Sequence, residues 1–292
     1  MSTVALLLVT GLGLGALYFL VAAGLSLIWG LMRVLNFAHG AFFTVAAYAG
    51  WVASRSIGTG TWGQWLLSVV VGIVTGGVFA ALAEVVLIRP LYARHVGQVL
   101  VTVGLALATL ALVEGGFGTD PVQLVLPAWM GDTTTILGAN VPNTRLLAIV
   151  AAALVLAVLL FFLRRTRFGL IVRAGVENRA MVQALGIDVQ RAFTLVFAIG
   201  GMAAGLAGVL AGAYFGTIDP ARGTTMLIFA FIVVVIGGLG SVTGSAVAAV
   251  VVGVLQQFLN FYAAAGVGDF SVVLLLAVVL LVRPGGLSGA TA

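Results

Sequence analysis

The run LLAIVAAALVLAVLLFFL at residues 146–163 contains eighteen consecutive residues without a charge, a proline or a glycine. A membrane hydrocarbon core about 30 Å thick is crossed by a helix of about 20 apolar residues. Strands of a membrane barrel would instead alternate polar and apolar residues in segments of about ten. The run therefore predicts a membrane-spanning helix, and a second run at residues 247–259 predicts another.

The composition extends this prediction to the whole chain of 292 residues. Hydrophobic residues make up 62% of it and charged residues only 7%, whereas soluble domains carry roughly 25% charged residues. Apolar runs cover residues 4–29, 36–53, 64–88, 96–118, 145–163, 192–216, 224–240, 241–263 and 270–282. We therefore predict an all-α, polytopic membrane bundle of eight or nine transmembrane segments, forming one domain over residues 1–292.

Glycine is the second feature of the composition, with 40 residues, about twice its usual share. Helices in lipid associate through small residues, which let their backbones approach closely. A stripe with four-residue spacing consists of Ala204, Gly208, Gly212 and Gly216. The pairs Gly72–Gly76 and Gly240–Gly244 repeat this spacing, so we expect all three sets to pack helices together.

The distribution of arginine predicts the orientation of the bundle. All thirteen permanently basic residues are arginines, and six lie in one connection, namely Arg164, Arg165, Arg167, Arg173, Arg179 and Arg191. Cytoplasmic loops carry an excess of arginine and lysine, so this connection is expected inside the cell. Counting outward from it places ten arginines inside and three outside, with Asp219 and Arg222 in an external loop. We predict an outside N-terminus and an inside C-terminus.

Two stretches interrupt the apolar pattern at membrane depth, Asn36–Gly40 and Gly237–Gly244. Non-helical backbone is tolerated there only where protein buries it or where it lines a cavity. We predict broken or re-entrant helices on a translocation path, with the candidate residues Asn36, Phe37, His39, Gly40, Gly237, Gly238, Gly240, Ser241, Thr243 and Gly244. Helix breaks in both halves of the chain suggest an internal inverted repeat. The residues of the two halves are only slightly similar, so the sequence leaves the existence of a repeat open.

The first of these stretches has a simpler alternative. Asn36 is also a good residue to cap a helix start, and His39 is either a titrating gate or a hydrogen-bonded structural residue. The structural role is the more common one for a single histidine.

Several kinds of chemistry are missing from the sequence. It has no cysteine, which excludes disulfides and thiol catalysis. Glu84 and Glu114 fall near predicted helix ends, whereas ion-coupled pumps usually carry a charge within the membrane. His39 and His95 have no acidic or cysteine neighbours to complete a metal site. A glycine-rich phosphate loop with a lysine is also absent, so we expect no cofactor, no catalysis and no ATP hydrolysis in this chain.

The arginine-rich connection contains one segment with helical periodicity, RAGVENRAMVQALGIDVQR at residues 173–191. Arg173 and Glu177 lie four residues apart, as an ion pair on a helix would. An apolar face consists of Ala180, Met181, Ala184 and Leu185, and Gly186 is expected to end the helix. This predicts an amphipathic helix of two to three turns, which either lies on lipid headgroups or docks a partner protein.

Five stretches together resemble one protein family. They are NFAHGAFFTVAAY at 36–48, RPLYARH at 89–95, RRTRFGLIVRAGVENRAMVQALGID at 164–188, GGLGSVTGSAVAAVVVG at 237–253 and RPGGL at 283–287. They occur in order over nearly the whole chain, and the chain resembles the permease subunit of branched-chain amino acid ABC importers, the H-type leucine/isoleucine/valine permease.

This resemblance implies a multi-pass subunit of the bacterial inner membrane. Its partners would be a second homologous permease, two ATPase subunits that bind the ATP, and a soluble binding protein that delivers the amino acid. The family's Ala…Gly motif for ATPase contact maps onto Ala180, Ala184, Gly186 and Ile187 in the cytoplasmic loop of residues 164–191. Flanking candidates for coupling are Arg173, Glu177, Met181 and Leu185. Glu177-Asn178-Arg179 departs from the Glu-Ala-Ala of the wider importer pattern.

The predicted function is therefore translocation of neutral aliphatic amino acids, with lipid as the surroundings and no nucleic acid partner. Permeases for urea or short amides in the same family remain an alternative. A secondary transporter or channel without ATPases would show a charged residue in mid-membrane and no docking helix. A membrane-embedded enzyme would need clustered histidines or acids, which the sequence does not have.

Overall fold

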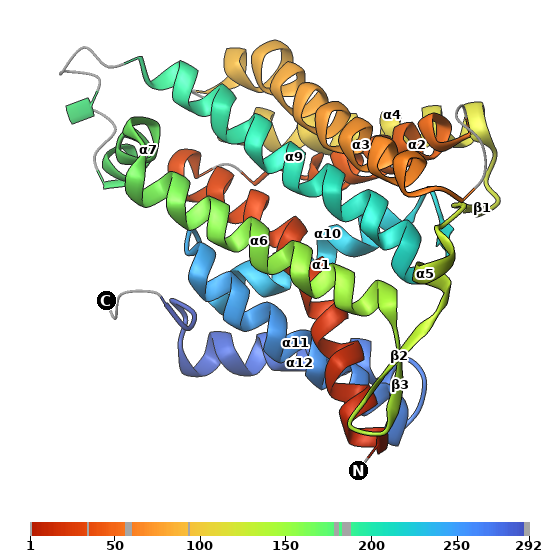
Figure 1. Cartoon of the computed structure of the whole chain (residues 1–292). Coiled ribbons are helices and arrows are strands. Elements are labelled where there is room, and N and C mark those ends of the chain that lie inside the picture. The colour runs from red at the N-terminus through yellow and green to blue at the C-terminus, as the bar shows by residue number, and fades with distance from the viewer. Residues whose placement is uncertain are drawn as a thin grey trace.

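The computed structural model describes residues 2–33, 35–55, 60–92, 94–177, 181–182 and 188–288. Its helices are α1 (Ser2–Met32), α2 (His39–Ser54), α3 (Trp62–Ala83), the π-helix η1 (Glu84–Ile88), the 3-10 helix η2 (Arg89–Leu91), α4 (His95–Phe117), α5 (Ala128–Gly131), α6 (Asn143–Arg165), α7 (Arg167–Glu177), α9 (Val189–Phe215), α10 (Arg222–Gly237), α11 (Val242–Tyr262) and α12 (Val267–Val282). The predicted all-α membrane bundle is confirmed (Figure 1).

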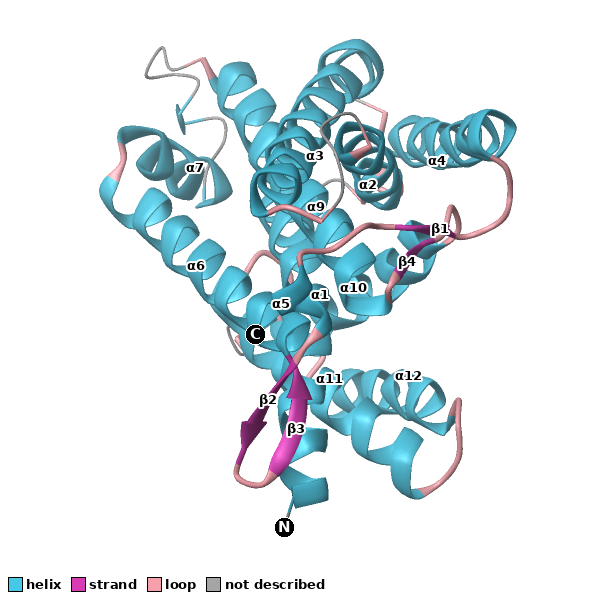
Figure 2. Ribbon diagram, turned by 45° about the vertical axis from the view of Figure 1, so that its right-hand side comes forward, coloured by secondary structure: helices cyan, strands magenta, loops and turns pink. Residues whose placement is uncertain are grey.

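Strands form only two short ribbons among the described residues (Figure 2). β1 (Val122–Gln123) pairs antiparallel with β4 (Thr217–Ile218), and β2 (Thr133–Ile136) pairs antiparallel with β3 (Ala139–Pro142). Both ribbons lie on the right-hand side of Figure 1, away from α7 and the C-terminus.

Helices occupy all of the apolar runs predicted from the sequence, but their lengths differ. Six segments are long and apolar enough to cross a membrane: α1, the continuous segment Trp62–Leu91, α4, α6, α9 and α11. α2, α10 and α12 have sixteen residues each. A helix of that length is about 24 Å long, shorter than a hydrocarbon core of about 30 Å. The number of complete spans therefore stays a prediction.

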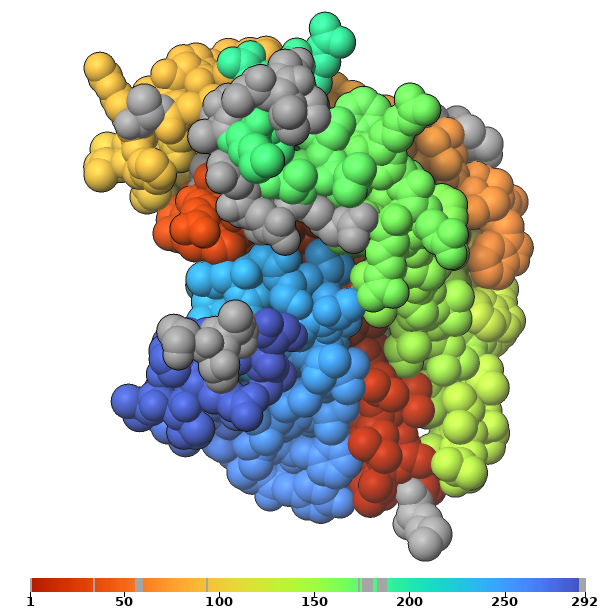
Figure 3. Space-filling view, turned by 90° about the vertical axis from the view of Figure 1, so that its left-hand side faces the viewer, coloured from red at the N-terminus to blue at the C-terminus, as the bar shows by residue number. Residues whose placement is uncertain are grey.

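The connections predicted to lie inside the cell gather on one face of the molecule. Figure 3 shows this face, with the end of α6 and the helix α7 (green) and the segment around residue 90 (yellow) in its upper part and the last described residues (dark blue) below them. This grouping agrees with the arginine count. Which side of the membrane the face occupies stays a prediction.

Close helix contacts occur where the glycine pattern predicted them. A Cβ atom added to Gly201 would overlap the carbonyl oxygen of Gly76, and one added to Gly205 would overlap that of Gly72. Gly208 lies against α2, where an added Cβ would sit 2.5 Å from the carbonyl oxygen of Phe43. Gly201 and Gly205 of α9 therefore pack against the predicted Gly72–Gly76 pair of α3, and Gly208 of the predicted stripe packs against α2.

Two members of the predicted glycine sets have other roles. Gly216 ends α9 with a φ of +78° and has no neighbour within 4 Å of an added Cβ. Gly240 has a φ of +87° and lies in the turn before α11. Both provide the left-handed backbone that glycine adopts most easily. Gly216 has no packing role, whereas Gly240 also contacts Gly30 of α1.

The helix contacts reveal an internal repeat that relates the first four long elements to the last four. In this repeat α1, α2, α3 and α4 correspond to α9, α10, α11 and α12. α2 and α3 both pack on α9, and their counterparts α10 and α11 both pack on α1. α2 also contacts α3 and α4, as α10 contacts α11 and α12. α1 and α9 run antiparallel, because Thr10 meets Tyr214 while Gly24 meets Gly200. The repeat is therefore inverted.

Replacing Gly201 with alanine should destabilise the bundle, because the new Cβ meets backbone that cannot move without separating α3 from α9. We expect a loss of about 1 to 3 kcal/mol, as for other overpacked interiors, measured as a lower melting temperature in detergent. Gly104→Ala on α4 is the matched control, since nothing lies within 4 Å of its added Cβ. Equal melting temperatures for the two variants would contradict the packing role.

Candidate translocation site and coupling surface

The break between α1 and α2 returns the chain into the interior of the bundle. α1 ends at Met32, whereas the imidazole Nε2 of His39, the first residue of α2, lies 3.1 Å from the carbonyl oxygen of Val21. With a rise of 1.5 Å per residue, Val21 lies roughly 16 Å from Met32 along the α1 axis. α2 therefore begins well inside the molecule, and the predicted helix break at Asn36–Gly40 is confirmed.

His39 is completely buried and makes a hydrogen bond, as the structural alternative required. Its ring also packs edge-on against Phe42, with centroids 5.7 Å apart. The Asn36 side chain accepts a hydrogen bond from the amide of Ala38 at 3.1 Å, so it shapes the turn before α2. Asn36 and His39 thus support the start of the helix from inside the protein.

A second helix start inside the bundle, between α9 and α10, was not predicted from the sequence. The hydroxyl of Thr44 on α2 donates to the carbonyl oxygen of Pro220 at 3.3 Å. A Cβ atom added to Gly40 would lie 2.5 Å from the carbonyl oxygen of Gly223. The N-termini of α2 and α10 therefore meet inside the bundle, and the prediction that Asp219 and Arg222 belong to an ordinary external loop does not describe this turn.

The turns that precede α2 and α10 are built alike. Asn36-Phe37-Ala38-His39-Gly40 precedes and begins α2, and Asp219-Pro220-Ala221-Arg222-Gly223 precedes and begins α10. The Asp219 carboxylate accepts from the amide of Ala221 at 2.8 Å, as Asn36 does from Ala38. The shared pattern is Asn or Asp, any residue, Ala, a basic residue and Gly. This pattern was the available sequence signal for the repeat.

The third stretch, Gly237–Gly244, is also a helix break, but it lies elsewhere. α10 ends at Gly237, α11 begins at Val242, and Ser241 caps α11 by accepting from the amide of Gly244 at 3.0 Å. Gly240 packs against Gly30 near the end of α1. The amides of Leu287 and Ser288 donate to the carbonyl oxygens of Ile236 and Gly237. The structure therefore does not bring this turn together with the junction at Gly40.

A helix that was not predicted from the sequence begins the arginine-rich connection. α7 spans Arg167–Glu177, and the hydroxyl of Thr166 accepts from the amide of Gly169 at 2.9 Å at its start. The predicted coupling helix overlaps α7 at residues 173–177, and its continuation stays a prediction. Arg173 and Glu177 lie on α7, and Met181 is exposed. Ala180, Ala184, Leu185, Gly186 and Ile187 lie outside the described residues.

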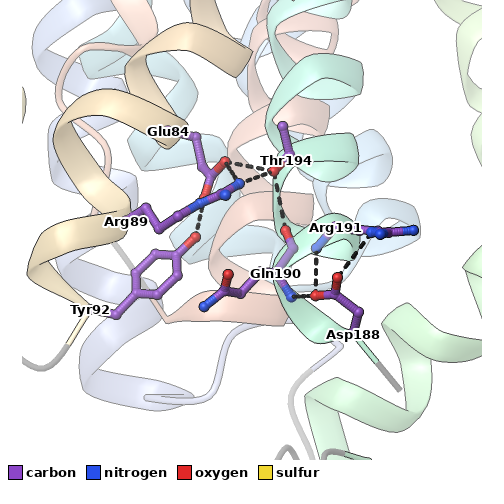
Figure 4. A network of polar contacts seen from close by, with 7 residues as sticks. All are labelled: Glu84, Arg89, Tyr92, Asp188, Gln190, Arg191 and Thr194. Carbon is purple, nitrogen blue, oxygen red and sulfur yellow. Dashed lines mark hydrogen bonds and ion pairs between the residues drawn. The ribbon is translucent and has the colours of Figure 1, made fainter. Parts of the chain in front are cut away.

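A buried polar network links the segment after α3 to the start of α9 (Figure 4). The Glu84 side chain is fully buried and accepts hydrogen bonds from Arg89 Nη2 at 3.0 Å and Thr194 Oγ1 at 2.7 Å. The phenol of Tyr92 donates to the same carboxylate. Burial, with the hydrogen bond to Glu84 next, raises the pKa of Tyr92, so its phenol stays protonated as a donor.

The local backbone explains how Glu84 reaches its partners. Glu84 opens the π-helix η1, and Arg89 with Pro90 forms the 3-10 helix η2 directly after it. Such π-turns often occur at functional sites. A buried charge that loses its partner costs about 3 to 5 kcal/mol, so this network is a strong constraint on the relative position of α3 and α9. Thr194 is distant in sequence, and nothing in the local pattern predicted it.

The comparisons with known proteins agree with this architecture. A family model described as "Branched-chain amino acid transport system / permease component" matches residues 7–283. The chain belongs to this family.

Two curated relatives match this chain over almost its entire length. It is 28% identical to the high-affinity branched-chain amino acid transport system permease protein LivH of Escherichia coli over 289 residues, which is 96% of this chain and 93% of LivH. It is also 28% identical to BraD of Pseudomonas aeruginosa, over 97% of this chain and 94% of BraD. The fructose import permease protein FruF of Bifidobacterium longum is 27% identical over 86% of the chain and 69% of FruF. No solved structure matches significantly.

The Glu84 network should be a determinant of the stability of this permease. Glu84→Gln removes the negative charge that receives the hydrogen bonds of Arg89, Tyr92 and Thr194, so we expect a loss of about 1 to 3 kcal/mol, visible as a lower melting temperature. The matched control is Asp188→Asn, which removes the ion pair with Arg191. That pair is exposed, such pairs contribute at most about 1 kcal/mol, and asparagine is an equally good helix cap.

If both variants melt at the wild-type temperature, the buried network does not hold α3 to α9. A further check is Thr194→Val, whose effect should not add to that of Glu84→Gln, because both remove members of one network.

Proposed function

We propose that this chain is the permease subunit of an ABC importer that moves branched-chain amino acids across the bacterial inner membrane. The observation that carries the proposal is the match to LivH proteins over nearly the full length of both chains. Those relatives are high-affinity branched-chain amino acid permeases by name. Membership of a transport family, and not of an enzyme family, supports transport as the activity.

The interior of the bundle suits a small neutral cargo. Among the described residues, only one acidic side chain is fully buried, that of Glu84, and it forms an ion pair with Arg89. A secondary transporter or ion channel would need a charge free to bind an ion or proton within the membrane. The pairing of Glu84 therefore supports a transporter whose energy comes from ATP on partner subunits.

The proposed partners are a second homologous permease, two ATPase subunits and a soluble binding protein. The ATPases would dock on the face shown in Figure 3, where α7 and the start of α9 flank the predicted coupling residues. The exposed apolar surfaces of α4 and α12 would face lipid or the second permease.

A sugar importer is the second candidate, because FruF is related to this chain at similar identity. Sugars need many hydrogen-bonding groups, since buried hydroxyls without partners cost free energy. The wall of the α2–α10 junction is mostly apolar, and its polar side chains are the three threonines Thr44, Thr109 and Thr224, fewer hydroxyls than a sugar carries. Urea or short amides would fit equally small sites, but the relatives that match over almost the whole chain favour aliphatic amino acids.

Uptake by the reconstituted complex tests the proposal. Liposomes containing the permease, its sister subunit and the ATPases should accumulate radiolabelled leucine, isoleucine or valine when the binding protein is outside and ATP is supplied to the ATPases. A complex without ATP is the control. Uptake of fructose or urea in preference to leucine would overturn the amino acid assignment, and uptake without ATP would favour a secondary transporter.

The coupling loop makes a separate prediction. Ala184→Trp or Gly186→Trp should abolish ATP hydrolysis stimulated by the loaded binding protein, because an indole cannot fit where a small residue meets an ATPase groove. Membrane insertion and pairing with the sister permease should persist, as co-purification would show. Leu170→Trp is the comparison that should keep coupling, since Leu170 on α7 is exposed, already large and not a predicted coupling residue. Normal coupling in both small-to-large variants would instead indicate that the segment lies on lipid headgroups.

A further inference from the structure

A cavity of about 160 Å³ lies where the N-terminal ends of α2 and α10 meet, and α4 lines its third side, where it is partly open because Leu107 is 64% exposed. It is apolar over most of its wall, with Ala106, Leu107 and Leu110 contributed by α4. An apolar cavity of about 150 Å³ is large enough to bind benzene. The space therefore accommodates an aliphatic side chain of the size found in leucine or valine.

The cavity lies between the two halves of the chain that the repeat relates. Phe37 and Pro220 line it at equivalent positions, just before α2 and α10 respectively. Thr44 and Leu227 also line it, each on the second turn of its helix. In transporters with inverted repeats, substrate sites lie near the bilayer midplane at the repeat interface, where helices are broken.

One part of the cavity wall offers hydrogen-bond donors. Gly40 and Ala41 line the cavity and belong to the first turn of α2. Within the described part of the chain, neither amide has a hydrogen-bond acceptor, whereas the next amide, that of Phe42, donates to Ala38. Free amides at a helix N-terminus attract an anion, and the helix dipole adds to this attraction.

A buried hydroxyl provides the second, independent sign of a ligand. Thr109 lines the cavity from α4, is only 5% exposed, and its hydroxyl makes no hydrogen bond to any residue that the structure describes. By contrast, the buried Thr102 on the same helix donates to the carbonyl oxygen of Val99 at 3.0 Å. The Thr109 oxygen is not among the fully buried atoms, so it is accessible from the cavity that Thr109 lines, and a ligand there would supply its partner.

The charged groups around the junction do not occupy the cavity wall. The Asp219 carboxylate is engaged with the amide of Ala221, and the Arg222 guanidinium lies over the ring of Phe215 at 4.2 Å. His39 is directed to Val21. The cavity wall is therefore uncharged, and its polar groups are the free amides on α2 and the hydroxyls of Thr44, Thr109 and Thr224, of which that of Thr44 donates to Pro220.

We propose that this cavity binds the amino acid during its passage, with the carboxylate at the amides of Gly40 and Ala41. The ammonium group lies at the Thr109 hydroxyl, and the aliphatic side chain lies against the wall formed by Leu107, Leu110 and Leu227. This assignment rests on the proposed transport function and adds a selectivity site within the permease itself, separate from the binding protein.

The first test changes the size of the cavity and measures the ratio of leucine to alanine uptake by the reconstituted complex. Ala106→Leu adds bulk to the wall and should lower this ratio about tenfold, since a change of a methylene or more in a fitted pocket has effects of that order. The same binding protein serves wild type and variant, so a change in the ratio arises in the permease. Ala111→Leu, at an exposed position on the same helix, should leave the ratio unchanged.

The second test removes the hydroxyl. Thr109→Val should reduce uptake of leucine and alanine alike, about fivefold, because both carry the ammonium group. Thr109→Ser should restore uptake, and Thr102→Val, whose hydroxyl serves only the helix backbone, should retain it. Co-purification with the ATPases and unstimulated ATP hydrolysis confirm that each variant is folded.

The outcomes separate the site from the function. If the wild-type complex takes up leucine but Ala106→Leu keeps the wild-type ratio, the cavity is not on the path and a lipid chain is its occupant. If Thr109→Val behaves as Thr102→Val does, the hydroxyl contacts no substrate and the proposal is overturned. If the wild type transports no branched-chain amino acid, the proposed function fails before the site is considered.

Discussion

The close crossing of α1 and α9 is the contact on which the rest of the structure depends. A Cβ atom added to Gly24 would lie 2.7 Å from the Cα atom of Gly200 and 2.9 Å from the His39 ring. In lipid there is no hydrophobic force between helices, so such close backbone approach supplies the packing energy. The crossing also leaves space beside Gly24 for His39, which allows α2 to begin inside the bundle.

The inverted repeat follows from this crossing. Each long central helix ends on a left-handed residue, Arg33 after α1 and Gly216 after α9. The chain then turns back into the bundle and starts a sixteen-residue helix behind an Asn or Asp turn. Gly40 and Gly223 meet between these two helices. Only residues without a Cβ fit at that contact, which explains why both short helices carry glycine at their second position.

The sequence predicted the features that depend on local pattern and missed those that depend on distant contacts. Apolar runs located the long helices, and the polar residues of Asn36–Gly40 marked the first break. Asp219 and Arg222 were predicted to lie in an external loop, because charged residues near the end of a span normally lie in the loop that follows it. Only comparison of the two turns would have shown the second break. The Thr166 cap would have placed α7 correctly, but Thr194 becomes a partner of Glu84 only through folding.

α9 connects the features that a coupled transporter needs. It begins directly after the predicted ATPase-contact segment, with Asp188 accepting from the amide of Gln190 at 3.0 Å. One turn later Thr194 joins the Glu84 network, and further along Gly201 and Gly205 pack on α3. Its last turns contact α2 through Gly208. The Glu84–Thr194 hydrogen bond holds the end of α3 to the start of α9, and Gly201 and Gly205 hold the two helices together further along. A displacement of α9 at Asp188 would therefore move α3 with it. α2 meets α9 through small residues such as Gly208, whereas α10 meets α1 where Phe229 stacks on Tyr18 with ring centroids 5.0 Å apart. Under the proposed function, a displacement of α9 would reach the junction between α2 and α10 through these contacts.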